Sequence, residues 1–119
     1  MTPPDQPPLA LTLGDPAGVG PEIVVKAWAQ LRHEGPSFMV RRVTTPKEAV
    51  AVFGEALPVL DIPLRSPVIA GQPSSTAASA IIRWIETAVG LALSGAVSGV
   101  VTAPIAKAPL YAAGFGFPG

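Results

Sequence analysis

The sequence of 119 residues contains no cysteine, a single histidine and few charged residues. Without cysteine the chain has no disulfide and no thiolate for catalysis or metal binding. The one histidine, His33, is too few for a histidine metal site, and we expect it to have a structural role at a helix C-terminus. Eight acidic residues balance eight basic ones, so the sequence lacks the basic excess typical of proteins that bind nucleic acids or anionic membranes.

The low content of charged residues also indicates what the surface of the chain contacts. Only 13% of the residues are charged, whereas folded soluble proteins average about 25%. A chain of this length can bury a core of its own. We therefore expect part of its surface to contact a partner subunit or a further portion of a longer chain.

The sequence predicts neither a secretory signal at its N-terminus nor a membrane-spanning helix. Residues 1–8 (MTPPDQPP) contain four prolines and no apolar stretch, which predicts a disordered lead rather than a secretory signal. Residues 87–106 carry no charge, but Gly90, Gly95 and Pro104 interrupt them, which argues against a membrane-spanning helix. We expect residues 9–119 to belong to one cytoplasmic domain.

Predicted strands and helices alternate along this domain. Apolar runs predict buried strands at residues 9–13 and 99–103, another strand at 38–40, and short or edge strands within the proline-rich residues 57–68. Helix signals predict helices at residues 20–34, 45–53, 75–94 and 110–113. The inward stripe of the longest helix is expected at Ala78, Ile81, Ile82, Ile85, Val89 and Ala92. This alternation is typical of an α/β fold with parallel strands.

The glycine-rich turn TLGDPAGVGPE, residues 12–22, is the first candidate site. Its glycines do not have the spacing of a dinucleotide fingerprint, and no Lys-Ser/Thr follows them as in a phosphate-binding P-loop. Two interpretations remain. The helix N-terminus that follows Gly20 favours an anion, although Asp15 opposes one. Alternatively, the glycines allow positive φ and close approach while Asp15 caps backbone amides.

The second candidate site is the segment VTAPIAK, residues 101–107. In open α/β sheets ligands gather at the carboxyl ends of strands, and this segment follows such an end. Thr102 would offer a hydroxyl there and Lys107 a cation. A solvated lysine in a loop is the alternative reading of Lys107.

Two segments, TLGDPAGVGPEIVVKA and VVTAPIAKAPLYAAGF, resemble the 4-hydroxythreonine-4-phosphate dehydrogenase family of vitamin B6 biosynthesis. The second contains the family's Thr-Ala-Pro-x-x-Lys pattern at Thr102, Ala103, Pro104 and Lys107. Gly71-Gln72 before a long helix also sits where the family has such a pair. The first segment is also similar to a turn of isopropylmalate and isocitrate dehydrogenases. The resemblance extends from about Leu9 to the last residue.

The resemblance implies a three-layer α/β/α fold with a mostly parallel sheet, in a homodimer whose cleft lies near the subunit interface. It implies oxidation of 4-phosphohydroxy-L-threonine by NAD or NADP, followed by decarboxylation to 3-amino-2-oxopropyl phosphate. A divalent metal (Zn, Mg or Co) would polarise the reacting alcohol and ketone. Asp15, Gly18, Thr102 and Lys107 are the residues expected to line the substrate and cofactor cleft.

The sequence departs from the family pattern at its C-terminal end. The family's His-Thr-Glu motif and its metal-binding histidines would follow Gly119. Ala106 stands where the family commonly has asparagine, and Pro109 interrupts a helix that usually continues in the family. We therefore expect an N-terminal portion, truncated at the C-terminus, with no catalytic or metal-binding residue of its own and no activity alone. The alternatives are a related dehydrogenase for a phosphorylated sugar acid or an aromatic dihydrodiol, and a non-enzymatic anion-binding module.

Overall fold

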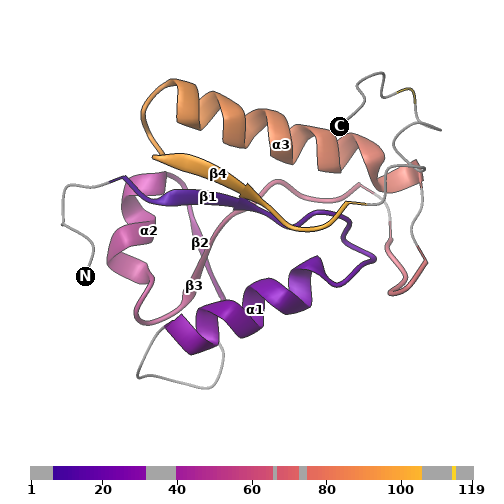
Figure 1. Ribbon diagram of the computed structural model, residues 1–119, viewed down its shortest axis with the longest axis horizontal. Coiled ribbons are helices and arrows are strands. Elements are labelled where there is room, and N and C mark those ends of the chain that lie inside the picture. Colours follow the sequence, from indigo (N-terminus) through magenta and orange to yellow (C-terminus); the bar gives the residue numbers. More distant parts are fainter. Residues whose placement is uncertain (1–6, 32–39, 66, 73–74, 106–113, 115–119) are drawn as a thin grey trace.

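The computed structural model describes residues 7–31, 40–65, 67–72, 75–105 and 114 (Figure 1). Its elements follow in the order β1 (Leu9–Thr12), α1 (Gly20–Leu31), β2 (Val40–Val43), α2 (Pro46–Val52), β3 (Leu57–Leu60), a 3₁₀ turn (Ser75–Ala77), α3 (Ala78–Leu93) and β4 (Gly99–Thr102). This order of strands and helices confirms the predicted α/β class. The helix expected at residues 110–113, His33 and Lys107 lie outside the described residues.

The described strands form two parallel pairs. β1 pairs with β4 in a register that aligns Leu11 with Val101 and Thr12 with Thr102. β2 pairs with β3, and Arg42 aligns with Val59. Both pairs are parallel, as the alternation of strands and helices predicted.

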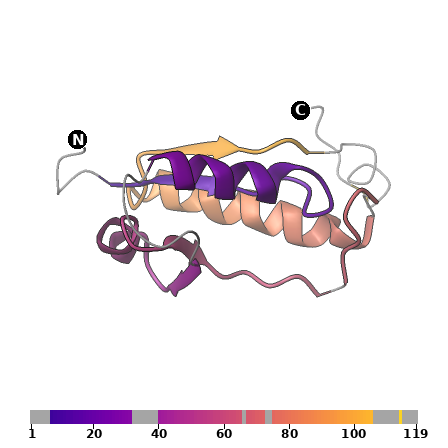
Figure 2. The same cartoon turned by 90° about the horizontal axis from the view of Figure 1, so that it is seen from below.

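The β1–β4 pair lies between two helices. α3 covers one side of it and α1 the other (Figure 1), and the view from below shows α1 in front of the strands with α3 behind them (Figure 2). This helix–sheet–helix order gives three layers. None of the described helices is long and apolar enough to cross a bilayer.

α1 begins at Gly20, the first residue of the helix predicted at residues 20–34, in the sequence Gly20-Pro21-Glu22. Proline in the first turn needs no intrahelical hydrogen bond, and the carboxylate of Glu22 suits the positive helix N-terminus. Val24 and Trp28, four residues apart on one face of the helix, are buried. The indole Nε1 of Trp28 donates a hydrogen bond of 2.8 Å to the carbonyl of Phe53, which fastens α1 to the end of α2.

α2 begins at a capping sequence, within the helix predicted at residues 45–53. Thr45 is extended (φ −138°, ψ 153°), and its hydroxyl accepts a hydrogen bond from the Glu48 amide. Proline follows directly at the first helical position. β2 occupies residues 40–43, so the strand predicted at 38–40 ends three residues too early, and Phe38 and Met39 lie outside the described residues.

One side of α3 packs into the apolar core. Ala77, Ala78 and Ile81 are buried and pack against Leu64 and Ile105, among others. The indole of Trp84 donates a hydrogen bond of 2.8 Å to the carbonyl of Ile62. Val89, which helical spacing assigned to the inner stripe, is exposed, so that prediction was wrong.

The prediction that β1 and β4 are buried strands was also wrong. Leu9, Leu11 and Val101 are among the exposed large apolar residues, and Thr102 is exposed as well. Within the described residues each strand has only one neighbouring strand, so an apolar sequence is not enough to bury it. Pro7 and Pro8, the last residues of the expected lead, accept hydrogen bonds from the Ser98 hydroxyl and the Ser98 amide respectively.

Candidate functional site

The glycine-rich turn and the segment after β4 meet at the carboxyl ends of β1 and β4, which form one edge of the strand pair. The amide of Ala103 donates to the carbonyl of Thr12 at 3.0 Å, and the amide of Asp15 donates to the carbonyl of Pro104 at 3.1 Å. The two candidate segments are therefore joined by backbone hydrogen bonds beyond the ends of their strands. This is the strand-end location at which open α/β sheets bind ligands.

Gly14 makes this approach possible. Its φ is +70°, and a Cβ at this position would lie 2.2 Å from the carbonyl oxygen of Pro104. Gly20 is restricted in the same way, because a Cβ there would lie 1.9 Å from the carbonyl oxygen of Leu13. The glycines thus serve close backbone approach, as one of the two interpretations predicted.

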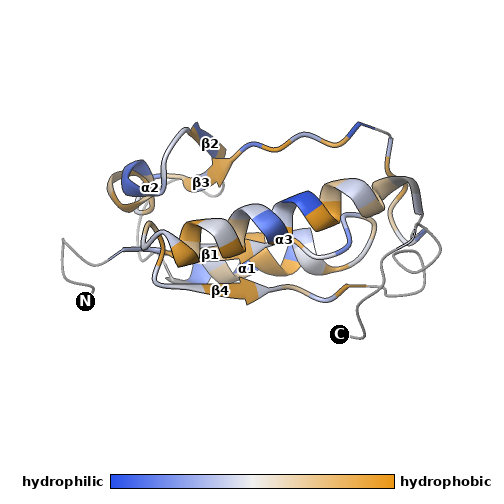
Figure 3. Cartoon of the chain, turned by 90° about the horizontal axis from the view of Figure 1, so that it is seen from above, coloured by the Kyte–Doolittle hydropathy of each residue, from blue (hydrophilic) through white to orange (hydrophobic). Residues whose placement is uncertain are grey.

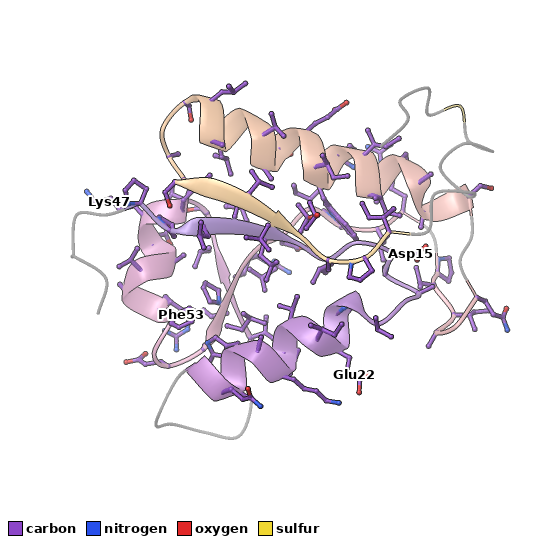
Figure 4. The ribbon with its side chains drawn as sticks, in the orientation of Figure 1. Asp15, Glu22, Lys47 and Phe53 are labelled. Atoms are coloured by element: carbon purple, nitrogen blue, oxygen red, sulfur yellow. The ribbon has the colours of Figure 1, made fainter. Side chains whose placement is uncertain are left out.

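Asp15 is almost completely buried within the turn, with 3% of its surface exposed. Its Oδ1 accepts a hydrogen bond of 2.9 Å from the amide of Ala17, which confirms the predicted capping role. Among the described residues, its Oδ2 has no hydrogen-bond partner. Figure 4 shows Asp15 beside the end of β4, while Glu22 lies on the outward side of α1.

A second buried polar atom lies on the adjoining strand end. The hydroxyl of Thr12 is buried and, within the described part of the chain, has no partner. Sequence reasoning missed Thr12, because a threonine at the end of an apolar run is ordinary in a strand. Two unpartnered polar atoms at neighbouring positions are unusual, since buried polar groups are nearly always hydrogen-bonded.

The other predicted site residues have different surroundings. Gly18 is exposed, and a Cβ there would lie 3.4 Å from its nearest neighbour, so glycine is not sterically required at this position. Thr102 is exposed and aligned with Thr12 across the strand pair. Lys107 lies outside the described residues. The structure thus brings Asp15 and Thr102 to the same edge.

A third segment reaches this edge from the loop before α3. The amide of Gly71 donates a hydrogen bond of 2.7 Å to the carbonyl of Ala17, and Gly71 has a φ of +78°. Gln72 pairs with Ile69 in an isolated bridge, which makes this a tight turn. Gly71-Gln72 was noted in the sequence but not counted among the site residues; the pair before a long helix was the available signal.

The described residues do not provide a metal site at this edge. No group of three or more histidine, aspartate, glutamate or cysteine residues is found among them. A hollow of about 350 Å³ lined by Val40, Arg42, Val59 and Asp61 lies on β2 and β3 instead. Arg42 and Asp61 form an ion pair of 3.0 Å there, so these charges already satisfy one another.

Comparison with known proteins decides the family. The family model described as "Pyridoxal phosphate biosynthetic protein PdxA" matches residues 13–119. The chain belongs to this family.

Individual PdxA relatives agree with the family match. A 4-hydroxythreonine-4-phosphate dehydrogenase of Caulobacter vibrioides is 62% identical over 94% of this chain. The enzyme of the same name from Zymomonas mobilis is 41% identical over the same share. In both cases the chain spans 38% of the relative's length.

Solved structures confirm that the PdxA fold is present. The crystal structure of the 4-hydroxythreonine-4-phosphate dehydrogenase from Klebsiella pneumoniae superposes with a TM-score of 0.83 at 33% identity. The match covers 96% of this chain and 42% of that one. The described α/β elements therefore form part of the PdxA fold.

Proposed function

We propose that this chain is part of a dehydrogenase that oxidises and decarboxylates 4-phosphohydroxy-L-threonine to 3-amino-2-oxopropyl phosphate in vitamin B6 biosynthesis. NAD or NADP would accept the hydride, and the complete enzyme would be a cytoplasmic homodimer. The observation that carries the proposal is the 62% identity to the Caulobacter vibrioides enzyme over nearly the whole chain. Its structural support is the carboxyl end of the β1–β4 pair, where the glycine-rich turn, the segment after β4 and the loop before α3 meet.

We assign the cleft wall to Asp15, Gly18, Thr102 and Lys107. Gly18 is exposed where the turn leads into α1, whose N-terminus favours an anionic group. Thr102 offers an exposed hydroxyl at the end of β4. Lys107, five residues further along the sequence, would supply a cation for the substrate phosphate. Asp15 would act as a positioning residue, because one of its oxygens holds the turn through Ala17.

The described residues do not fit the divalent metal that the reaction class uses. They contain no cluster of three metal-binding side chains, and they lack the dinucleotide fingerprint. We therefore derive no chemical step through the metal or the nicotinamide from this chain, and we propose no catalytic residue within it. The isolated chain is expected to be inactive.

A single-chain hybrid tests the proposal. In this hybrid, residues 1–119 replace the matching portion of the Caulobacter vibrioides enzyme. NADH or NADPH formation is measured with 4-phosphohydroxy-L-threonine, a phosphorylated sugar acid and an aromatic dihydrodiol. Turnover is expected with the first substrate only. Preference for either of the others would replace the proposed substrate, and a folded hybrid without any turnover would contradict the proposal.

Two lysine variants of the hybrid test the cleft assignment. Lys107→Ala is expected to lower kcat/KM by at least about tenfold through loss of a charge-assisted contact to phosphate. Lys47→Ala is the matched control, because Figure 4 shows Lys47 beside α2, at the opposite end of the molecule from Asp15. Equal kcat/KM for the two variants would remove Lys107 from the cleft.

A further inference from the structure

Asp15 is a buried carboxylate without a cationic partner. It is almost completely buried, and among the described residues no lysine or arginine forms an ion pair with it. Three exposed carboxylates of the chain, in contrast, each pair with a basic side chain: Glu22, Glu55 and Asp61. An unpaired charge costs far more when it is buried than when water surrounds it. The least solvated of these four carboxylates therefore has the greatest need of a positive charge.

The elements next to Asp15 do not supply that charge. β1 reads LALT and β4 reads GVVT, and Figure 3 shows β4 in mainly hydrophobic colours. The N-terminus of α1, which begins five residues later at Gly20, carries a partial charge of only about +0.5. No amide of that helix donates a hydrogen bond to Oδ2 of Asp15, because this oxygen has no partner among the described residues.

The oxygen atoms around Asp15 form the donor set of a hard cation. Oδ2 of Asp15 and Oγ1 of Thr12 are both buried and, in the described part of the chain, unpartnered. The carbonyl oxygens of Ala103 and Pro104 lie against Gly14, which separates the turn from the strand end. A carbonyl oxygen has two lone pairs, so that of Pro104 can accept the Asp15 amide and still bind a second partner. Carboxylate, hydroxyl and carbonyl oxygens are the ligands that hard cations prefer.

The charge of this donor set favours a monovalent cation. The described residues contain no group of three or more metal-binding side chains, which argues against the multi-ligand site of a divalent metal but not against a site for a single positive charge. We propose that Asp15 and Thr12, with the neighbouring carbonyl oxygens, bind a monovalent alkali cation. The cation neutralises the buried carboxylate and holds the glycine-rich turn against the end of β4. This inference does not depend on the proposed substrate or activity.

The dependence of unfolding on the cation tests the site. Thermal unfolding of the 119-residue chain and of the single-chain hybrid is measured in NaCl, KCl and tetramethylammonium chloride at equal ionic strength. Tetramethylammonium is too large to enter a buried site. The midpoint is expected to be higher in NaCl or KCl by at least about 3 °C, because a ligand that binds only the folded state stabilises it. Equal midpoints in all three salts would overturn the proposal.

Two carboxylate variants show where the cation binds. Asp15→Asn keeps an oxygen to cap the Ala17 amide but removes the charge, so the difference between the salts should disappear. Asp61→Asn is the matched control, because Asp61 pairs with Arg42 on the β2–β3 pair, and it should keep the full difference. Thr12→Val should raise the salt concentration at the half-maximal effect by at least about tenfold, because it removes one ligand without changing the shape of the side chain. Equal salt dependence in Asp15→Asn and Asp61→Asn would overturn the proposal, whether or not the hybrid turns over substrate.

Discussion

Replacing Gly14 by alanine tests whether the glycine-rich turn depends on close backbone approach. Alanine at this position meets two obstacles. The backbone has a φ of +70°, and the new Cβ would lie 2.2 Å and 2.7 Å from the carbonyl oxygens of Pro104 and Ala103. Both neighbours are backbone atoms, so a side-chain rotation cannot relieve the overlap.

The expected cost follows from these two obstacles. The left-handed conformation costs a residue with a Cβ roughly 1–2 kcal/mol. Moving the end of β4 away also breaks the hydrogen bond from the Asp15 amide to Pro104, which contributes about 1 kcal/mol. Gly14→Ala should therefore destabilise the chain by about 2–3 kcal/mol, a large share of the stability of a typical domain.

Gly71 and Gly90 serve as controls, because neither has a close neighbour in its Cβ direction and, of the two, Gly71 has the positive φ. Gly71 has a φ of +78° but open space around its Cβ direction, so Gly71→Ala should cost only the roughly 1–2 kcal/mol of the left-handed conformation. Gly90 lies within α3, also in open space, and Gly90→Ala should stabilise by about 0.5–1 kcal/mol. Urea unfolding followed by tryptophan fluorescence gives all three values, in the isolated chain and in the hybrid. Equal costs for Gly14→Ala and Gly71→Ala would refute the close approach.

Three side-chain hydrogen bonds give further predictions. Asp15→Ala removes the acceptor of the Ala17 amide and should cost about 1–3 kcal/mol in urea unfolding, whereas Asp15→Asn keeps an acceptor and should cost less. Thr44→Val should raise the pKa of Glu48 in an NMR titration, because hydrogen bonding from Thr44 is the largest cause that lowers it. Since the folded pKa is lowered, the associated stability is present above the unfolded pKa and is lost as pH falls through the folded one. Trp84→Phe should cost at least about 1 kcal/mol by thermal unfolding, because it leaves a half-buried carbonyl without its donor.

Local signals predicted the elements well because they act within a few residues. The Thr45-Pro46 sequence determined where α2 begins, and Gly20-Pro21-Glu22 did the same for α1. Each signal combines a cap or a proline with the helix dipole, which needs no tertiary contact. The meeting of residues 14–18 with residues 102–104 could also be predicted, since parallel strands end at the same edge.

Burial could not be predicted in the same way. An apolar run such as residues 9–12 is typical of a buried strand, but exposure depends on what packs against it. Val89 illustrates the same limit, because helical spacing assigns a side chain to a face and not a partner to that face. The contact of Gly71 with Ala17 depends on the path of a long loop, which no local pattern encodes.

The two side-chain oxygens of Asp15 have different surroundings, and these correspond to the structural and the functional interpretation of the turn. Capping the Ala17 amide uses one carboxylate oxygen, and the side-chain oxygen of an asparagine would keep that acceptor. The aspartate instead keeps a second oxygen buried and, among the described residues, unpartnered, next to a strand end with a buried hydroxyl. A cap that uses only Oδ1 does not account for this second oxygen. If the oxygen serves the cleft, Asp15→Asn in the hybrid lowers kcat/KM while unfolding changes little, whereas a purely structural aspartate leaves kcat/KM unchanged.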